Sequence, residues 1–212
     1  PSIGSGLIFP VSEDSLMIDP ISIEDHWPRI AAIDFGWDHP TAVVWCAVDN
    51  ETDTFYVYDC YRASKASPAV HAEIIRQRPR FIPIAYPHDG NRRDSMGNPG
   101  LADQYRSHGC NFLLEHFTNP PALGQTKGSN SIEEGLMAMI QSMEDGRFKV
   151  FNTLSDWFEE FRMYHRKQGK VVAIRDDLMS ATRYAFQSQR HAIAGSDPTW
   201  TNEIVYKDYG IV

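Results

Sequence analysis

The sequence contains no long hydrophobic run, and its longest uninterrupted apolar segment, Ala42–Val48, has only seven residues. A membrane-spanning helix needs roughly 20 apolar residues, so no membrane span is expected. Cysteine is also scarce: the three cysteines form no C-x-x-C pair and cannot all pair with one another. Cys46, Cys60 and Cys110 are therefore predicted to be reduced, small residues of the core.

Positive charge is in deficit as well. The sequence has 20 Lys and Arg against 28 Asp and Glu, a net charge of −8. This balance excludes a generic basic coat for nucleic acid, but it does not exclude a nucleic-acid enzyme whose acidic residues hold metal ions. The chain also lacks a G-x-x-x-x-G-K-[ST] phosphate loop and any H-E-x-x-H zinc motif. Asp34-Phe35-Gly36 imitates a kinase triplet, but no H-R-D loop accompanies it.

An ordered series of strand and helix patterns fills most of the sequence. Hydrophobic periodicity and turn residues predict strands over 29–34, 41–48, 54–61, 81–86, 111–115 and 148–151, with a short extended piece over 171–174. They predict helices over 67–77, 100–107, 131–145, 153–168 and 176–189, with Ser131 and Thr153 as caps. Three early strands with short turns form an antiparallel meander, and the later alternation predicts a compact α/β fold with a mixed sheet covered by helices.

Composition divides the chain into three parts. Residues 1–28 are expected to be a lead-in, 29–190 the domain, and 191–212 a tail. Because the sequence opens Pro-Ser-Ile without Met, we expect it to be a piece of something longer.

Acidic residues stand at the ends of three predicted elements. Asp34 closes the first strand, Asp89 follows the fourth strand at a Gly turn, and Asp176 and Asp177 open the last helix. If the first and fourth strands are parallel neighbours, Asp34 and Asp89 meet at one edge of the sheet, where α/β sheets place their sites. An acid at the start of the helix would then be the third carboxylate there.

Each of these acids has an ordinary alternative role, because Asp is common in turns and at helix N-termini. Three unpaired carboxylates in one pocket, however, would repel one another unless a cation neutralised them. Hard oxygen ligands suit Mg²⁺ or Mn²⁺, and two such ions about 4 Å apart suit in-line phosphoryl displacement. His39 and His88 lie beside these acids in the sequence. Two interpretations are open: either histidine orients a water or a phosphate, or it is a turn residue without a functional role.

Basic residues cluster despite the negative net charge. The clusters are Arg76, Arg78 and Arg80; Arg92 and Arg93; and Arg162, Arg166, Lys167 and Lys170. They are either solvated faces or contacts for a phosphate backbone. The second and third clusters flank the predicted acidic site, which favours the phosphate interpretation for them.

Several segments, in order, resemble the nuclease domain of phage terminase large subunits. They are GSGLIFP, AAIDFGWDHPTAVVW, YPHDG, SIEEGLMAMIQSMEDGRFKVF and IRDDLMSATRYA, within residues 4–187. The resemblance implies a ribonuclease H-like fold and an endonuclease that cuts concatemeric viral double-stranded DNA with two Mg²⁺ or Mn²⁺ ions. It further implies a preceding ATPase domain, partners in the portal or procapsid and the small terminase subunit, and a place in the host cytoplasm, transiently at the procapsid vertex.

On that resemblance Asp34 would bridge both ions, Asp89 would hold one and a helix acid the other. Where many relatives carry a further Asp in the helix motif, this chain has Ser180. Positions 176 and 180 share a helix face, which favours Asp176 as the ligand, with Asp177 as a cap or a supporting residue. Candidate DNA contacts are Arg92, Arg93, Arg166, Lys167 and Lys170.

Other interpretations remain open at this point. The chain could be another ribonuclease H-like nuclease, of the resolvase or transposase type, or a non-catalytic module that docks on a capsid. Asp34-x-Gly36 followed by Thr41 also imitates the phosphate loop of actin-like ATPases and sugar kinases. Those folds duplicate the domain and need well over 212 residues, so that interpretation is disfavoured.

Overall fold

A six-stranded mixed sheet forms the centre of the computed structural model, which describes residues 6–92, 97, 99–172 and 175–196. Its strands are β2 (Met17–Ile18), β3 (Arg29–Asp34), β4 (Thr41–Asp49), β5 (Thr54–Ala63), β6 (Ile84–Ala85) and β7 (Phe148–Phe151), in the order β2-β7-β5-β4-β3-β6. β4 runs antiparallel to β3 and β5, whereas β3 and β6, β5 and β7, and β2 and β7 are parallel pairs.

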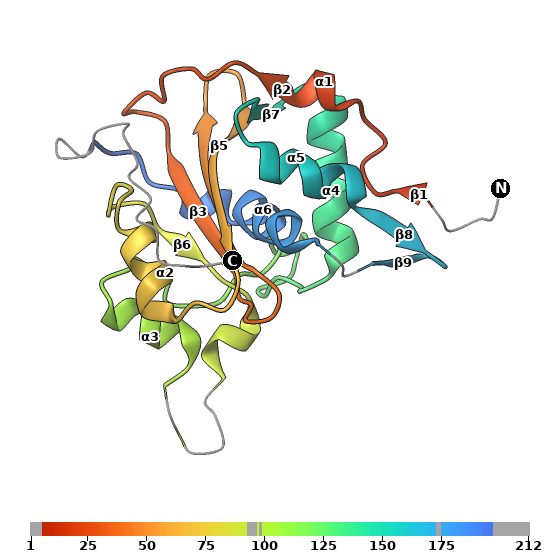
Figure 1. The fold of residues 1–212 in the computed structure, drawn as a ribbon. Coiled ribbons are helices and arrows are strands. Elements are labelled where there is room, and N and C mark those ends of the chain that lie inside the picture. The colour runs from red at the N-terminus through yellow and green to blue at the C-terminus, as the bar shows by residue number, and fades with distance from the viewer. Residues whose placement is uncertain (1–5, 93–96, 98, 173–174, 197–212) are drawn as a thin grey trace.

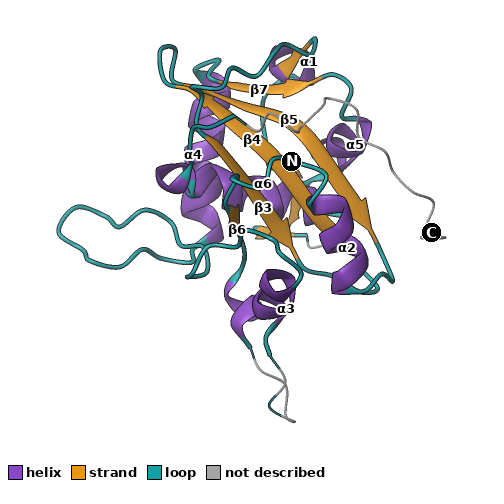
Figure 2. Ribbon diagram, turned by 90° about the vertical axis from the view of Figure 1, so that its left-hand side faces the viewer, coloured by secondary structure: helices purple, strands orange, loops and turns teal. Residues whose placement is uncertain are grey.

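Helices cover both faces of this sheet (Figures 1 and 2). One face packs against α2 (Pro68–Ile75) and α3 (Leu101–Ser107), and the other against α4 (Ile132–Glu144), α5 (Ser155–Met163) and α6 (Asp177–Gln187). Successive side chains of a strand point to opposite faces. In β3, Ile30 and Ala32 pack on the face covered by α4, α5 and α6, whereas Ala31 and Ile33 pack on the face covered by α2 and α3. β3 is apolar without alternation because both of its faces are buried.

Residues at both ends of the described chain pack onto this domain. β1 (Gly6–Leu7) pairs with β8 (His165–Lys167), which pairs in turn with β9 (Lys170–Val171) in a second small sheet. A short helix, α1 (Glu13–Leu16), precedes β2, and Leu16 is fully buried. At the other end, Ile193 pairs with Arg29 of β3. Residues 6–18 of the expected lead-in therefore pack onto the domain, while 197–212 of the expected tail lie outside the described residues.

The predicted meander is confirmed, and the first and fourth strands are parallel neighbours, the condition under which Asp34 and Asp89 meet at one edge. Three predicted elements were wrong in extent. The strand expected over 81–86 is limited to β6, Ile84–Ala85. The strand expected over 111–115 is reduced to one bridge between Phe112 and Ile84. The helix expected over 153–168 ends at Met163, and the last residues of the predicted helix instead belong to the β8–β9 hairpin.

The error in that helix has a physical cause. Trp157, Phe161 and Tyr164 have helical spacing and are all buried, but Tyr164 reaches the core from extended backbone at φ −72° and ψ 108°. The helix begins at Ser155 with Leu154 at the cap position, so Thr153 is not its cap, whereas the Ser131 hydroxyl does accept a bond from the Glu134 amide. No helix of the described residues has the length and apolar character of a membrane span.

Candidate active site

Asp34 ends β3 and lies on the face of the sheet that α6 covers. It follows Ile30 and Ala32 in the two-residue period of the strand and is half-buried. The Tyr184 hydroxyl of α6 donates a 3.3 Å hydrogen bond to Asp34 Oδ1. The strand end and the helix therefore meet at this carboxylate.

Asp89 lies at the same edge of the sheet, as predicted. It follows β6 in a 3₁₀ turn, His88–Asn91, and is exposed. Because β6 is parallel to β3, the two strands deliver Asp34 and Asp89 to one edge. Gly90 closes the turn: a Cβ there would lie 2.6 Å from the Phe35 ring, next to Asp34 in sequence.

The acids of α6 are not used as caps of their own helix. Asp176 occupies the cap position, but its side chain makes no capping hydrogen bond. Asp177 is only 8% exposed, and its Oδ2 has no hydrogen-bond partner among the described residues. The Leu178 amide instead donates a 2.7 Å bond to Glu160 Oε2 of α5. The ordinary role of Asp at a helix start is thus taken by Glu160, and Oδ2 of Asp177 stays available.

The pKa values of these acids show that they act on one another. Burial, followed by the charges of Asp177, Asp176 and Asp89, raises the pKa of Asp34 to about 8. Burial and the Asp177 charge raise the pKa of Asp176 to about 6, and burial raises the pKa of Asp177. His39, in the turn after β3, opposes the shift at both helix acids. An uncompensated negative cluster favours a bound cation.

The donor set fits a divalent ion in its chemistry. Carboxylate oxygens are the ligands that Mg²⁺ and Mn²⁺ prefer, and the buried Asp177 Oδ2 lacks a partner among the described residues. Within that part of the chain, no three acidic, His or Cys side chains already surround one point closely enough to hold an ion.

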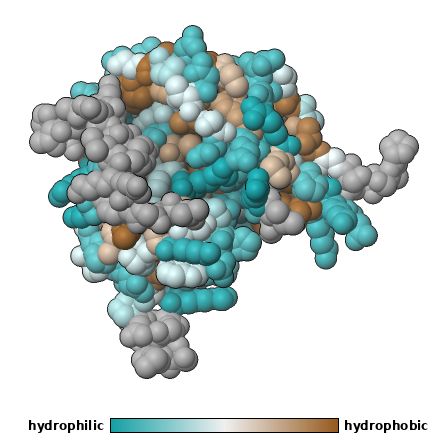
Figure 3. All heavy atoms as spheres, viewed as in Figure 1, coloured by the Kyte–Doolittle hydropathy of each residue, from teal (hydrophilic) through white to brown (hydrophobic). Residues whose placement is uncertain are grey.

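The basic candidates are placed less uniformly. Arg92 is exposed beyond Asp89, and Arg93 lies outside the described residues. Arg166 makes a two-bond ion pair with Glu133, at 2.7 and 2.6 Å, so its charge is already engaged. Lys167 and Lys170 are exposed on the β8–β9 hairpin, whose tip is hydrophilic at the right of Figure 3.

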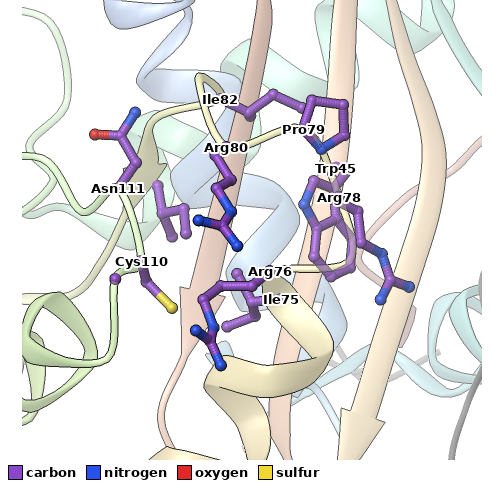
Figure 4. Close-up of a pocket in the computed structure, with 11 residues that line it drawn as sticks. Trp45, Ile75, Arg76, Arg78, Pro79, Arg80, Ile82, Cys110 and Asn111 are labelled. Carbon is purple, nitrogen blue, oxygen red and sulfur yellow. The ribbon is translucent and has the colours of Figure 1, made fainter. Parts of the chain in front are cut away.

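The cluster at 76–80 lies at the other end of β6, before the strand begins. Arg78 is buried, packs its guanidinium 4.2 Å from the centre of the Trp45 ring and pairs with Asp59 at 2.9 Å, so it is a structural residue. Arg76 and Arg80 line a small hollow beside it (Figure 4). This hollow is separate from the acidic edge.

Three residues of the site were missed in the sequence: Tyr184, Glu160 and Arg62. Arg62 donates a 3.0 Å hydrogen bond to Glu160 Oε1, and Glu160 holds the start of α6. A weak signal existed for Tyr184, since it lies seven residues, or two helical turns, after Asp177. Glu160 lies one residue before Phe161 in a segment that reads as an amphipathic helix, so nothing local marked it as buried.

A mixed sheet of this strand order, with acids converging where β3 and β6 end, defines a ribonuclease H-like domain. The family model described as the terminase RNaseH-like domain matches residues 31–189. The chain therefore belongs to the terminase RNase H-like domain family.

Relatives and solved structures agree with this assignment. The large terminase subunit of Salmonella phage P22 is 38% identical over 193 residues, which are 91% of this chain and 38% of that protein. The large subunit of Enterobacteria phage LP7 is 38% identical over 187 residues, 88% of this chain and 38% of that protein. This chain thus spans little more than a third of the length of either relative.

The solved nuclease domain of the P22 large terminase superposes with a TM-score of 0.81 at 37% identity, covering 91% of this chain and 97% of that one. The nuclease domain of the bacteriophage SPP1 large terminase, crystallised with bound Mn, has a TM-score of 0.53 at 18% identity, covering 81% and 94%. The SPP1 likeness concerns the fold alone.

Proposed function

We propose that this chain is a Mg²⁺- or Mn²⁺-dependent endonuclease domain that cuts concatemeric viral double-stranded DNA during genome packaging. The observation that carries the proposal is the convergence of Asp34, Asp89 and the α6 acids, whose charges add to the effect of burial in raising the pKa of Asp34 to about 8. Membership of the terminase family and the Mn bound by the SPP1 domain support the same chemistry. The partners we propose are an ATPase domain, the portal or procapsid and the small terminase subunit, with action in the host cytoplasm at the procapsid vertex.

We propose Asp34, Asp89 and one helix acid as ligands of two divalent ions. Such ions, when bound, supply an activated water and stabilise the departing 3′ oxygen. Tyr184 holds Asp34 by Oδ1, which fixes the direction of the carboxylate and leaves Oδ2 for an ion. Asp34, at the centre of the cluster, is best placed to be shared between two ions.

The choice between the helix acids favours Asp177 on the contacts of α6. Asp177 and Tyr184 lie two turns apart on one stripe of the helix, and Tyr184 touches Asp34. Asp177 also contributes more than Asp176 to the raised pKa of Asp34, and its buried Oδ2 has no described partner. The sequence argument that preferred Asp176, through its shared face with Ser180, is therefore outweighed. We propose that Asp176 supports the site from the cap position.

A plasmid assay tests this function. Supercoiled DNA should stay intact in chelator and be cut in millimolar Mn²⁺, and an Asp34→Asn variant that keeps its fold should not cut. A matched control is Asp103→Asn, because Asp103 is a surface acid of α3 paired with Arg106. A wild-type chain that neither cuts DNA nor binds Mn²⁺ would refute the proposal and favour a non-catalytic docking module.

A further inference from the structure

The N-terminus of α6 is capped from outside the helix. Of the donors in its first turn, the Leu178 amide bonds to Glu160 Oε2 at 2.7 Å, although two carboxylates of the same helix, Asp176 and Asp177, lie closer in sequence. α5 and α6 lie side by side, so Glu160 reaches α6 directly (Figure 1). A borrowed cap is unusual, because N-caps normally come from the residue before the helix.

Glu160 is fully buried, and both of its oxygens are engaged. Oε2 accepts the Leu178 amide, and Oε1 accepts Arg62 Nη1 of β5 at 3.0 Å. Arg62 is held in turn by Asp156 at 3.1 Å and by Glu159. Burying a carboxylate is unfavourable unless such partners satisfy it, and with both oxygens occupied Glu160 is not free to ligate an ion.

We propose that Glu160 is a positioning residue that fixes the first turn of α6, so that Asp176 and Asp177 keep their carboxylates free for a divalent ion. This inference rests on the proposed function. Were either acid to cap the helix itself, its oxygens would be tied to backbone amides and would be weaker ion ligands. Residues that orient metal ligands in this way typically change metal affinity by about 10–100-fold when altered.

Glu160→Gln tests the proposal with little change in volume. Glu160 meets Leu178 and Arg62 with two different oxygens, whereas Gln has one, so its amide NH₂ would face one of these two donors. We expect the Mn²⁺ concentration at the midpoint of the metal-induced rise in Tm, and at half-maximal cleavage, to increase about tenfold or more. Most of the wild-type rate should return at saturating Mn²⁺, which a general loss of folding would not allow.

Asp156→Asn is the matched control, because Asp156 shares Arg62 with Glu160 but has no hydrogen bond to α6 among the described residues. Its Mn²⁺ midpoints should equal those of the wild type. Should Glu160→Gln fail to fold, Glu160→Asp keeps the charge, withdraws it from the Leu178 amide and should raise the midpoint likewise. Hydrogen exchange at Leu178 should be faster in either variant and unchanged in the control.

Unchanged Mn²⁺ midpoints in the folded Glu160 variants would overturn the positioning role while leaving the nuclease proposal intact. A wild-type chain whose Tm and DNA cleavage ignore Mn²⁺ would instead overturn the proposed function. The two failures are therefore distinguishable in one set of titrations.

Discussion

Replacing Asp34 by Asn removes the central charge of the acidic cluster while keeping the size of the side chain. In the ion-free protein, burial and the neighbouring carboxylates raise the pKa of Asp34 from 3.8 to about 8. A carboxyl whose pKa is higher in the folded chain favours folding while it is protonated. That contribution is complete below pH 3.8 and is lost as the pH rises through about 8. At pH 7 the loss has an upper limit of about 4 kcal/mol, at 1.36 kcal/mol per pKa unit.

We expect about half of this limit, roughly 2 kcal/mol, because Asp34 is half-buried and water screens part of the repulsion. Without divalent ions at pH 7, Asp34→Asn should therefore raise Tm by roughly 4–8 °C in a domain of this size. The difference should be small near pH 4, where the carboxyl is protonated in the folded chain and about half protonated in the unfolded chain, and should vanish below pH 3.8. Mn²⁺ should raise the Tm of the wild type and have little effect on the variant.

Thermal unfolding followed by circular dichroism at pH 4, 7 and 8.5, with chelator or with Mn²⁺, measures all of these differences. Equal Tm values for wild type and variant in chelator at pH 8.5 would refute the argument that Asp34 is destabilised by its neighbours. An equal response of both proteins to Mn²⁺ would refute its role as an ion ligand.

Three further comparisons of variants test other parts of the site. Asp177→Asn should reduce Mn²⁺-dependent cleavage more than Asp176→Asn, by about tenfold or more, and the reverse ranking would restore the choice of Asp176. Tyr184→Phe removes the hydrogen bond that lowers the pKa of Asp34, so the acid limb of the pH–rate profile should move to higher pH. An acid limb at the wild-type pH would show that this hydrogen bond has no role in cleavage. Lys167→Gln combined with Lys170→Gln should weaken DNA binding in a filter assay and reduce the slope of log K against log[salt] by about one to two in magnitude. An unchanged slope would exclude the hairpin from the DNA interface.

Local patterns were sufficient to predict the centre of the fold. The apolar run of 29–34 and the β-branched run that follows determine a buried strand and its neighbour, and the observed β3 and β4 match them closely. The sequence argument took the parallel pairing of the first and fourth strands as a condition, and the observed pairing of β3 with β6 meets it and places Asp34 and Asp89 at one edge. Strand-end acids are visible in a sequence because their position depends on local structure alone.

Contacts between distant segments could not be predicted in this way. Arg62 and Glu160 are 98 residues apart, and Tyr184 and Asp34 are 150 apart, so no periodicity links them. The choice between the helix acids depends on such contacts too: a shared face with Ser180 favoured Asp176, and we propose Asp177 because of its burial against the rest of the domain. The β8–β9 hairpin was missed because Tyr164 is buried in helical register without being helical.

The central claim is that carboxylates from β3, the turn after β6 and α6 gather around divalent ions. A crystal soaked in Mn²⁺ and measured at the manganese absorption edge tests this most directly. The account predicts anomalous density between Asp34, Asp89 and Asp177, with Asp34 shared if two peaks appear. Density located elsewhere, or none at saturating Mn²⁺, would contradict it.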